Sequence, residues 1–176
     1  QFISMGLRFG TFSITLTLIP IVVGSALYGW GSGAWLGFVF GVTVLLTGDA
    51  NLFLAVNIPG TIITVILKGA LAGAAAGFVY KLISKKNQIV AVIVSAIVAP
   101  VVNTGIFVLG SYVFFFDYLS GLAEGTNLFV FILVGLVGIN FFIELGINLV
   151  LNPAILQIIR IGKKNFGGKN QIIKTK

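Results

Sequence analysis

The chain has 176 residues, of which 58% are apolar and only 9% carry a charge, and its mean hydropathy is +1.14. Because a water-soluble domain has about 25% charged residues, this composition excludes a soluble globule and indicates an integral membrane protein. Cysteine and histidine are both absent, which excludes disulfides, thiolate metal sites and thiol nucleophiles and removes the usual imidazole base. We therefore expect no metal site and no cofactor.

Five apolar blocks follow one another along the chain, and each is a candidate membrane-spanning helix. They cover residues 12–29, 33–47, 60–83, 89–116 and 127–160. A transmembrane helix needs about 20 mostly apolar residues, whereas a membrane β-strand alternates apolar and polar residues over about ten. Only residues 13–18 alternate in that way, so the sequence predicts an all-α integral membrane fold.

Turn-forming residues and prolines divide these blocks. A glycine-rich segment at 29–33 separates the first two, and Pro59 opens the third helix, where its missing N–H costs little. Pro100 lies inside the fourth block, where we expect a kink whose freed carbonyl group is satisfied by a neighbouring helix. The last block is longer than one span, so we expect it to bend near residues 152–153.

The net charge is +7, and the basic residues gather after two of the apolar blocks. They are Lys81, Lys85 and Lys86 after the third block, and Arg160, Lys163, Lys164, Lys169, Lys174 and Lys176 after the last. Lys and Arg are enriched in the cytoplasmic loops of membrane proteins. This pattern places the C-terminal tail, about 161–176, in the cytoplasm, and it argues against nucleic acid as a partner.

The acidic residues support the same orientation. Asp49, Asp117 and Glu124 lie in the loops on the other side of the predicted spans, which are therefore outside. Five crossings with a cytoplasmic C-terminus put Arg8 outside as well. An even number of crossings would bring both termini to one side, so we expect a further helix before Gln1. The chain, 1–176, is otherwise expected to be one multi-pass domain in the cell membrane.

Two ionisable residues lie inside apolar blocks, where burial is costly and a functional role is the first hypothesis. Lys68 follows Thr61 and Thr64 at a spacing that puts all three on one helix face. At 1.5 Å per residue, Lys68 is about 12 Å below the outer end of its helix. A cation facing an outward-opening cavity there would favour an anion such as a carboxylate.

The other intramembrane polar groups lie in the last two blocks. Glu144 stands between Asn140 and Asn148 at four-residue intervals, and Asn103 and Thr104 form a polar pair near the middle of the fourth block. These residues have two interpretations. Asn103 could bind a polar solute together with Lys68, or Lys68 and Glu144 could form a structural ion pair while the asparagines bond neighbouring helices, at about 0.6 kcal/mol per contact.

Glycines recur at four-residue intervals on two of the predicted helices. They are Gly33, Gly37 and Gly41 on the second helix and Gly69, Gly73 and Gly77 on the third. Such small-residue stripes let helices approach closely. We interpret them either as packing within the chain or as a docking surface for another membrane protein.

Residues 13–29, SITLTLIPIVVGSALYG, and the following GAWLGF at 33–38 resemble the S components, the substrate-binding subunits, of energy-coupling factor (ECF) vitamin transporters. In that family an extended segment leads into a helix that ends in a turn similar to GxxLYGxxxG. Four further phrases resemble the pantothenate-specific group. These are LAVN at 54–57, LKG at 67–69, PVVNTG at 100–105 and NFFIELGIN at 140–148, and the resemblance as a whole covers about residues 7–162.

The resemblance implies a six-helix S-component bundle, of which five helices are visible here, that binds a vitamin in its outer half and topples in the membrane to deliver it. It implies three protein partners: a transmembrane coupling subunit (T component) and two cytoplasmic ATPases. The chain has no G-x-x-x-x-G-K-[ST] motif, so ATP hydrolysis is expected on those partners and the chain itself is not expected to be an enzyme. The family's alanine-rich first helix is missing from this sequence, so its docking residues cannot be named.

The resemblance also suggests which residues bind the substrate. They are Asn57, Lys68, Asn103, Asn140 and Glu144, to which Arg8 and Thr64 are added. Pantothenate carries one carboxylate, which matches Lys68 or Arg8, and amide and hydroxyl groups that suit Asn and Thr side chains. Three alternatives stay open: the same scaffold for another small vitamin or precursor, a membrane scaffold with structural polar stripes, and a membrane enzyme with Glu144 as a lone acid–base group.

Overall fold

The computed structural model describes part of the chain in full detail. The backbone is described for residues 8–9, 12–13 and 18–172, and side chains for 18–138 and 141–164. The described chain begins with a small antiparallel pair, β1 (Arg8–Phe9) and β2 (Phe12–Ser13), in which Arg8 is paired with Ser13. Helices joined by short turns make up the rest of the described chain, which confirms the predicted all-α fold class. Of the predicted first helix, 12–29, the structure describes α1 from Leu18 to Tyr28, and the start of this block, Phe12–Ser13, forms β2 instead.

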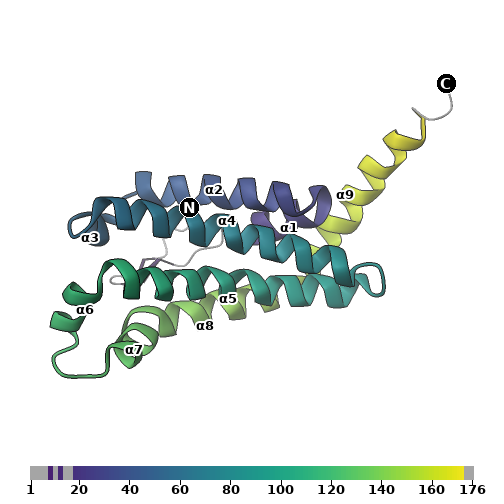
Figure 1. The fold of residues 1–176 in the computed structure, drawn as a ribbon. Coiled ribbons are helices and arrows are strands. Elements are labelled where there is room, and N and C mark those ends of the chain that lie inside the picture. The colour runs from purple at the N-terminus through teal and green to yellow at the C-terminus, as the bar shows by residue number, and fades with distance from the viewer. Residues whose placement is uncertain (1–7, 10–11, 14–17, 173–176) are drawn as a thin grey trace.

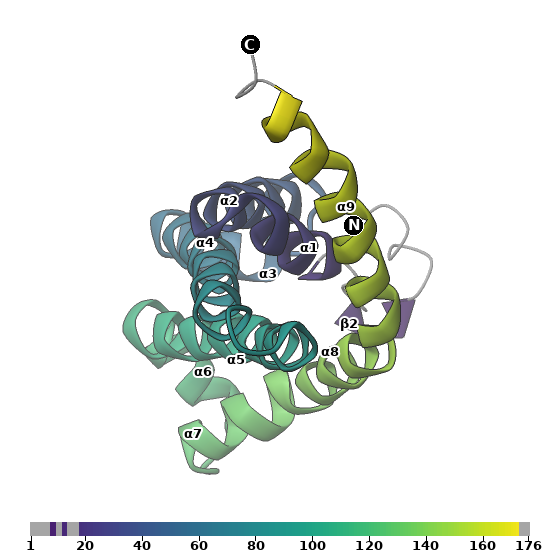
Figure 2. The same cartoon turned by 90° about the vertical axis from the view of Figure 1, so that its right-hand side faces the viewer.

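The helices form an elongated bundle (Figure 1). In chain order they are α1 (Leu18–Tyr28), α2 (Trp30–Leu46), α3 (Asn51–Leu54), α4 (Ile58–Ile83), α5 (Gln88–Phe114), α6 (Phe116–Leu122), α7 (Leu128–Val130), the π-helix η2 (Phe131–Gly138), α8 (Ile139–Val150) and α9 (Asn152–Ile172). Viewed along the bundle, α4 and α5 lie between α1 and α2 on one side and α8 on the other, and α9 passes beside α1 (Figure 2).

Within the described residues, two helices, α4 and α5, are long and apolar enough to cross a membrane. A third candidate is the pair of segments Leu128–Gly138 and Phe141–Val150, which are bent by 42° relative to one another. The helices α1 and α2 are apolar but shorter, with 11 and 17 residues. The predicted break near residue 152 is confirmed, because α8 ends at Val150 and α9 begins at Asn152. The π-helix before α8 was not predicted.

Local signals explain where the helices begin. Asn57 and Asn87 have extended backbones and cap α4 and α5. The Asn57 Oδ1 accepts the N–H of Gly60 at 2.9 Å, and the Asn87 Oδ1 accepts those of Ile89 and Val90 at 2.9 and 3.1 Å. These bonds satisfy N–H groups that have no partner within the helix. The turn between α1 and α2 is made at Gly29, whose φ of 95° favours glycine.

The glycine stripes of α2 and α4 face one another. A Cβ atom on Gly37 or Gly69 would overlap the carbonyl oxygen of the other, and the same holds for the pair Gly33 and Gly73. A Cβ on Gly41 would lie 2.8 Å from the Val65 carbonyl oxygen. The two backbones therefore touch along this seam, as small-residue stripes allow. Of the two interpretations of these glycines, packing within the chain is the one that the structure shows.

Pro100 lies within α5, which continues through it. A proline has no N–H for the carbonyl group four residues earlier, which here belongs to Ala96. The Asn148 Nδ2 on α8 donates to that carbonyl oxygen at 3.3 Å, and Asn148 is only 2% exposed. The prediction that a neighbouring helix satisfies the freed carbonyl is confirmed, and Asn148 has a structural role.

Candidate functional site

The register between α4 and α5 decides which polar residues meet. The two helices are antiparallel, and the Asn57 Nδ2 donates to the Phe114 carbonyl oxygen at 3.3 Å, while the Ser95 Oγ donates to that of Ala76 at 3.0 Å. Lys68 lies eleven residues after Asn57, and Asn103 lies eleven residues before Phe114. The same register therefore places Lys68 at the level of Asn103 on the neighbouring helix.

The ammonium group of Lys68 lies beside an aromatic ring. Its Nζ is 5.4 Å from the centroid of the Phe107 ring on α5, and the Lys68 side chain is half-buried. A cation over an aromatic face gains about 0.5–2 kcal/mol, with the larger values where water is excluded. Phe107 follows Asn103 by one helical turn, so the ring and the amide lie on the same face of α5. Phe107 was not singled out from the sequence.

Two carboxylates act electrostatically on Lys68. They are Glu144 on α8 and Asp49 in the turn between α2 and α3. Glu144 is only 8% exposed, and Asp49 is half-buried and accepts a hydrogen bond from the Thr47 Oγ1 at 2.9 Å. The α2–α3 turn and α8 therefore each contribute a carboxylate whose charge acts on Lys68 of α4. Asp49 was predicted only as part of an outer loop.

Two of the predicted site residues have buried polar atoms that the fold does not use. Thr64 and Asn103 are 4% and 8% exposed. Within the residues whose side chains are described, neither the Thr64 Oγ1 nor the Asn103 Oδ1 has a hydrogen-bond partner. The buried Ser111 Oγ also lacks a hydrogen-bond partner among these residues. A buried polar atom without a partner costs about 1–3 kcal/mol, so each is a place where a ligand or a water molecule would be stabilised.

Thr64 lies at a close approach of α4 and α5. A Cβ atom on Gly110 would overlap the Thr64 side chain, so the glycine lets α5 approach α4 at this level. Ser111 follows Phe107 by four residues, and Asn103, Phe107 and Ser111 therefore form one stripe along α5. This spacing is present in the sequence and could have identified Ser111.

Asn57 differs from these residues because both ends of its side-chain amide already have partners. The Oδ1 caps α4 and the Nδ2 holds the end of α5. The structure therefore places Asn57 at the end of the α4–α5 pair where α4 begins and α5 ends, in a position that orders both helices. A direct role of Asn57 in binding a substrate stays a prediction.

Two further candidates, Arg8 and Asn140, have side chains outside the described set. The backbone of Arg8 belongs to β1 and that of Asn140 to α8. The residues that the structure brings together are therefore Thr64 and Lys68 from α4, Asn103 from α5 and Glu144 from α8. This arrangement offers a cation, an amide and a hydroxyl group beside an aromatic ring, together with the carboxylates of Glu144 and Asp49. Its cation can pair with a small polar anion.

Comparison with known proteins gives one match. The model of the family described as ECF transporter, substrate-specific component, matches residues 1–156. The matched part includes α1 to α8 and every candidate residue of the site. No curated protein and no solved structure matches the chain.

Proposed function

Because this chain belongs to the family of ECF transporter substrate-specific components, we propose that it is the vitamin-binding subunit of an ATP-driven importer and that its substrate is pantothenate. Members of this family bind the substrate of a transporter and are not enzymes. The observation that carries the choice of a small organic anion is the position of Lys68 opposite Asn103, with polar atoms of Asn103 and Thr64 unused by the fold.

The chemistry of pantothenate fits this cluster group by group. Its carboxylate pairs with the Lys68 ammonium, and its amide and hydroxyl groups pair with Asn103 and Thr64. Its geminal methyl groups have an apolar surface in Phe107, whose ring lies beside the ammonium. Glu144 accepts from a substrate hydroxyl group and balances the charge of Lys68 when the site is empty. Buried polar partners also give selectivity, because an analogue without the hydroxyl leaves them unpaired.

The transport cycle proposed here follows the family. The basic end of the bundle faces the cytoplasm, so the turns at Asp49 and at residues 117–127 open to the outside. The chain works with a T component and two ATPases, and toppling in the membrane delivers the bound vitamin inward. The separation of the acidic turns and the basic residues at opposite ends of the bundle supports this orientation (Figure 1).

The proposal is tested by calorimetric titration of the purified protein in detergent with pantothenate. We expect Lys68→Met to weaken binding about 10- to 100-fold, because a hydrogen bond to a charged group contributes about 1.5–3 kcal/mol. Lys81→Met is the matched control, since Lys81 lies on the same helix but is exposed at its other end, and it should bind normally.

A second variant separates binding from folding. Lys68→Met leaves Glu144 buried without its cation, which destabilises the fold, whereas Lys68→Met/Glu144→Gln has neither charge. If this double variant is folded by circular dichroism and still binds pantothenate at full affinity, the proposed site is wrong. If the unaltered, folded protein does not bind pantothenate, the choice of vitamin is wrong. Titration with other anionic vitamins then identifies which of them the protein binds.

A further inference from the structure

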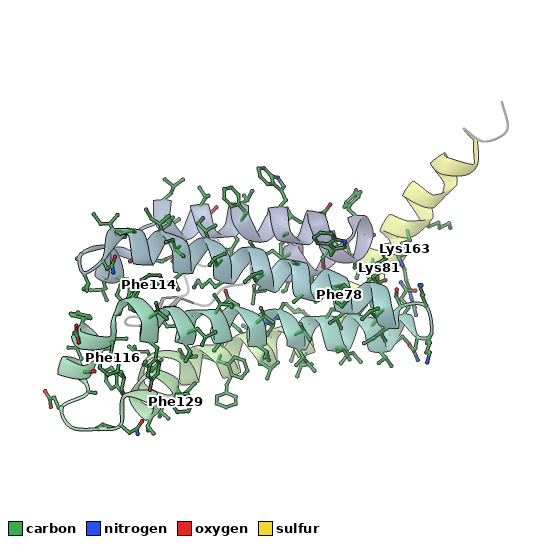
Figure 3. The ribbon with its side chains drawn as sticks, in the orientation of Figure 1. Phe78, Lys81, Phe114, Phe116, Phe129 and Lys163 are labelled. Atoms are coloured by element: carbon green, nitrogen blue, oxygen red, sulfur yellow. The ribbon has the colours of Figure 1, made fainter. Side chains whose placement is uncertain are left out.

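One end of the bundle carries a concentrated positive charge. Its exposed basic side chains, among those described, are Lys81, Lys85, Lys86, Arg160, Lys163 and Lys164. Figure 3 shows Lys81 and Lys163 at the same end, far from Phe114 and Phe116. All four acidic residues of the chain lie elsewhere: Asp49 and Glu124 in turns and Asp117 in α6, all at the opposite end, and Glu144 on α8. Within the part of the chain whose side chains are described, these basic groups therefore have no carboxylate near them.

The helix α9 supplies half of these charges and is held against the bundle. Ile155 and Ile159 are fully buried in a cluster with residues of α1, α4 and α5. A Cβ atom on Gly162 would lie 2.8 Å from Leu27 of α1, and the Lys163 Nζ is 5.0 Å from the Tyr80 ring centroid. Beyond these contacts α9 leaves the bundle at an angle (Figure 1).

The exposed surface of α9 has two different sides. At 3.6 residues per turn, Ile158 and Ile161 lie on one side of the buried seam, and Arg160 and Lys164 lie on the other. Ile158 is 49% exposed and Ile161 is 54% exposed. A helix with an exposed apolar side and an exposed basic side is typical of one that lies at a membrane surface.

We propose that α9 and the α4–α5 turn form a binding surface for the headgroups of anionic phospholipids. The apolar side of α9 rests on the acyl chains, and the basic side contacts the phosphates. Lys85 and Lys86 extend the same surface across the turn. Lipid is favoured over a soluble acidic partner because exposed apolar side chains, Phe78 and Leu82 among them, border the charges. The proposal depends on membrane insertion and not on the identity of the vitamin.

The two tryptophans of the chain report on this end of the bundle. Trp30 begins α2 and Trp35 lies in its second turn, and they are 55% and 64% exposed. Trp30 packs on Gly77 of α4. It lies three residues after Leu27, and Leu27 contacts α9 at Gly162. Lipids with brominated acyl chains quench tryptophan fluorescence on contact. The extent of quenching therefore measures which headgroup class surrounds the basic end of the bundle.

The experiment uses the full chain in phosphatidylcholine vesicles that contain phosphatidylglycerol as the anionic lipid. In one set only the phosphatidylglycerol is brominated, and in the matched set an equal amount of phosphatidylcholine is brominated instead. We expect stronger quenching by brominated phosphatidylglycerol, and we expect high salt to reduce the difference. Equal quenching in the two sets at low salt overturns the proposal.

Two neutralised variants locate the surface while leaving Lys163 in its contact with Tyr80. Arg160→Gln/Lys164→Gln and Lys85→Gln/Lys86→Gln should each lower the preference for phosphatidylglycerol by about fivefold per charge removed. The matched control, Arg160→Lys/Lys164→Arg, keeps both charges and should keep the preference. If both neutralised variants fold, by circular dichroism, and retain the full preference, the anionic lipid binds elsewhere and the proposal is wrong.

Discussion

The hydrogen bond from Asn148 to the Ala96 carbonyl can be tested with Asn148→Leu. Pro100 supplies no N–H for that carbonyl, so the variant leaves a buried backbone acceptor without a partner. A buried unsatisfied group costs about 1–3 kcal/mol, and a hydrogen bond between membrane helices contributes about 0.6 kcal/mol on average. We expect Asn148→Leu to lower the free energy of unfolding by about 1–2 kcal/mol.

A second change at Pro100 makes this expectation specific. Pro100→Ala restores an N–H four residues after Ala96, so it should remove most of the cost of Asn148→Leu. The measurement is reversible unfolding in mixed detergent, followed by circular dichroism, for the two single variants, the double variant and the unaltered chain. If Asn148→Leu costs the same with and without Pro100→Ala, the freed carbonyl is not what Asn148 stabilises, and the reasoning fails.

Ser95 provides a control for this cycle. Its Oγ also donates to a carbonyl of a neighbouring helix, that of Ala76, at 3.0 Å. Within α4 that carbonyl keeps the N–H of Tyr80 as its helical partner. Ser95→Ala should therefore cost less than Asn148→Leu, about 0.6 kcal/mol.

Two further predictions concern packing and capping. Gly69→Ala should lower the unfolding midpoint strongly, because its methyl group overlaps the Gly37 carbonyl and overpacking costs about 1–3 kcal/mol. The control is Gly105→Ala, which should be neutral or stabilising because no atom lies within 4 Å of the new Cβ. Equal effects of the two variants on the midpoint would contradict the α2–α4 seam. Asn87→Ala should destabilise α5 by about 1 kcal/mol, because it removes the cap, and Asn87→Asp, measured in the same unfolding assay, should retain most of the stability.

The polar residues inside the bundle divide into two groups. Asn57 and Asn148 make hydrogen bonds that order helices. The structural interpretation of the sequence proposed this for Asn148, whereas Asn57 was predicted to bind the substrate. Thr64 and Asn103 have buried atoms without a partner among the described residues, which packing alone does not explain. The binding hypothesis therefore rests on this second group together with Lys68, which follows Thr64 on α4 and lies at the level of Asn103 on α5.

The sequence alone was sufficient for the membrane class and for the two long helices. The predicted blocks 60–83 and 89–116 differ by at most two residues from α4 and α5, Ile58–Ile83 and Gln88–Phe114. Apolar runs, capping asparagines and prolines act over a few neighbouring residues, so the chain shows them directly. The break before α9 follows from the same local chemistry at Pro153.

Only the tertiary structure decided which of these residues meet. The sequence showed two glycine stripes, but not that they face one another, and it showed Pro100 and Asn148, but not that one compensates for the other. It identified Lys68 and missed Phe107, the ring beside it. These contacts depend on the rotation and register of helices that are distant in sequence. Hydropathy is nearly uniform around such helices, so it does not specify which face meets which neighbour.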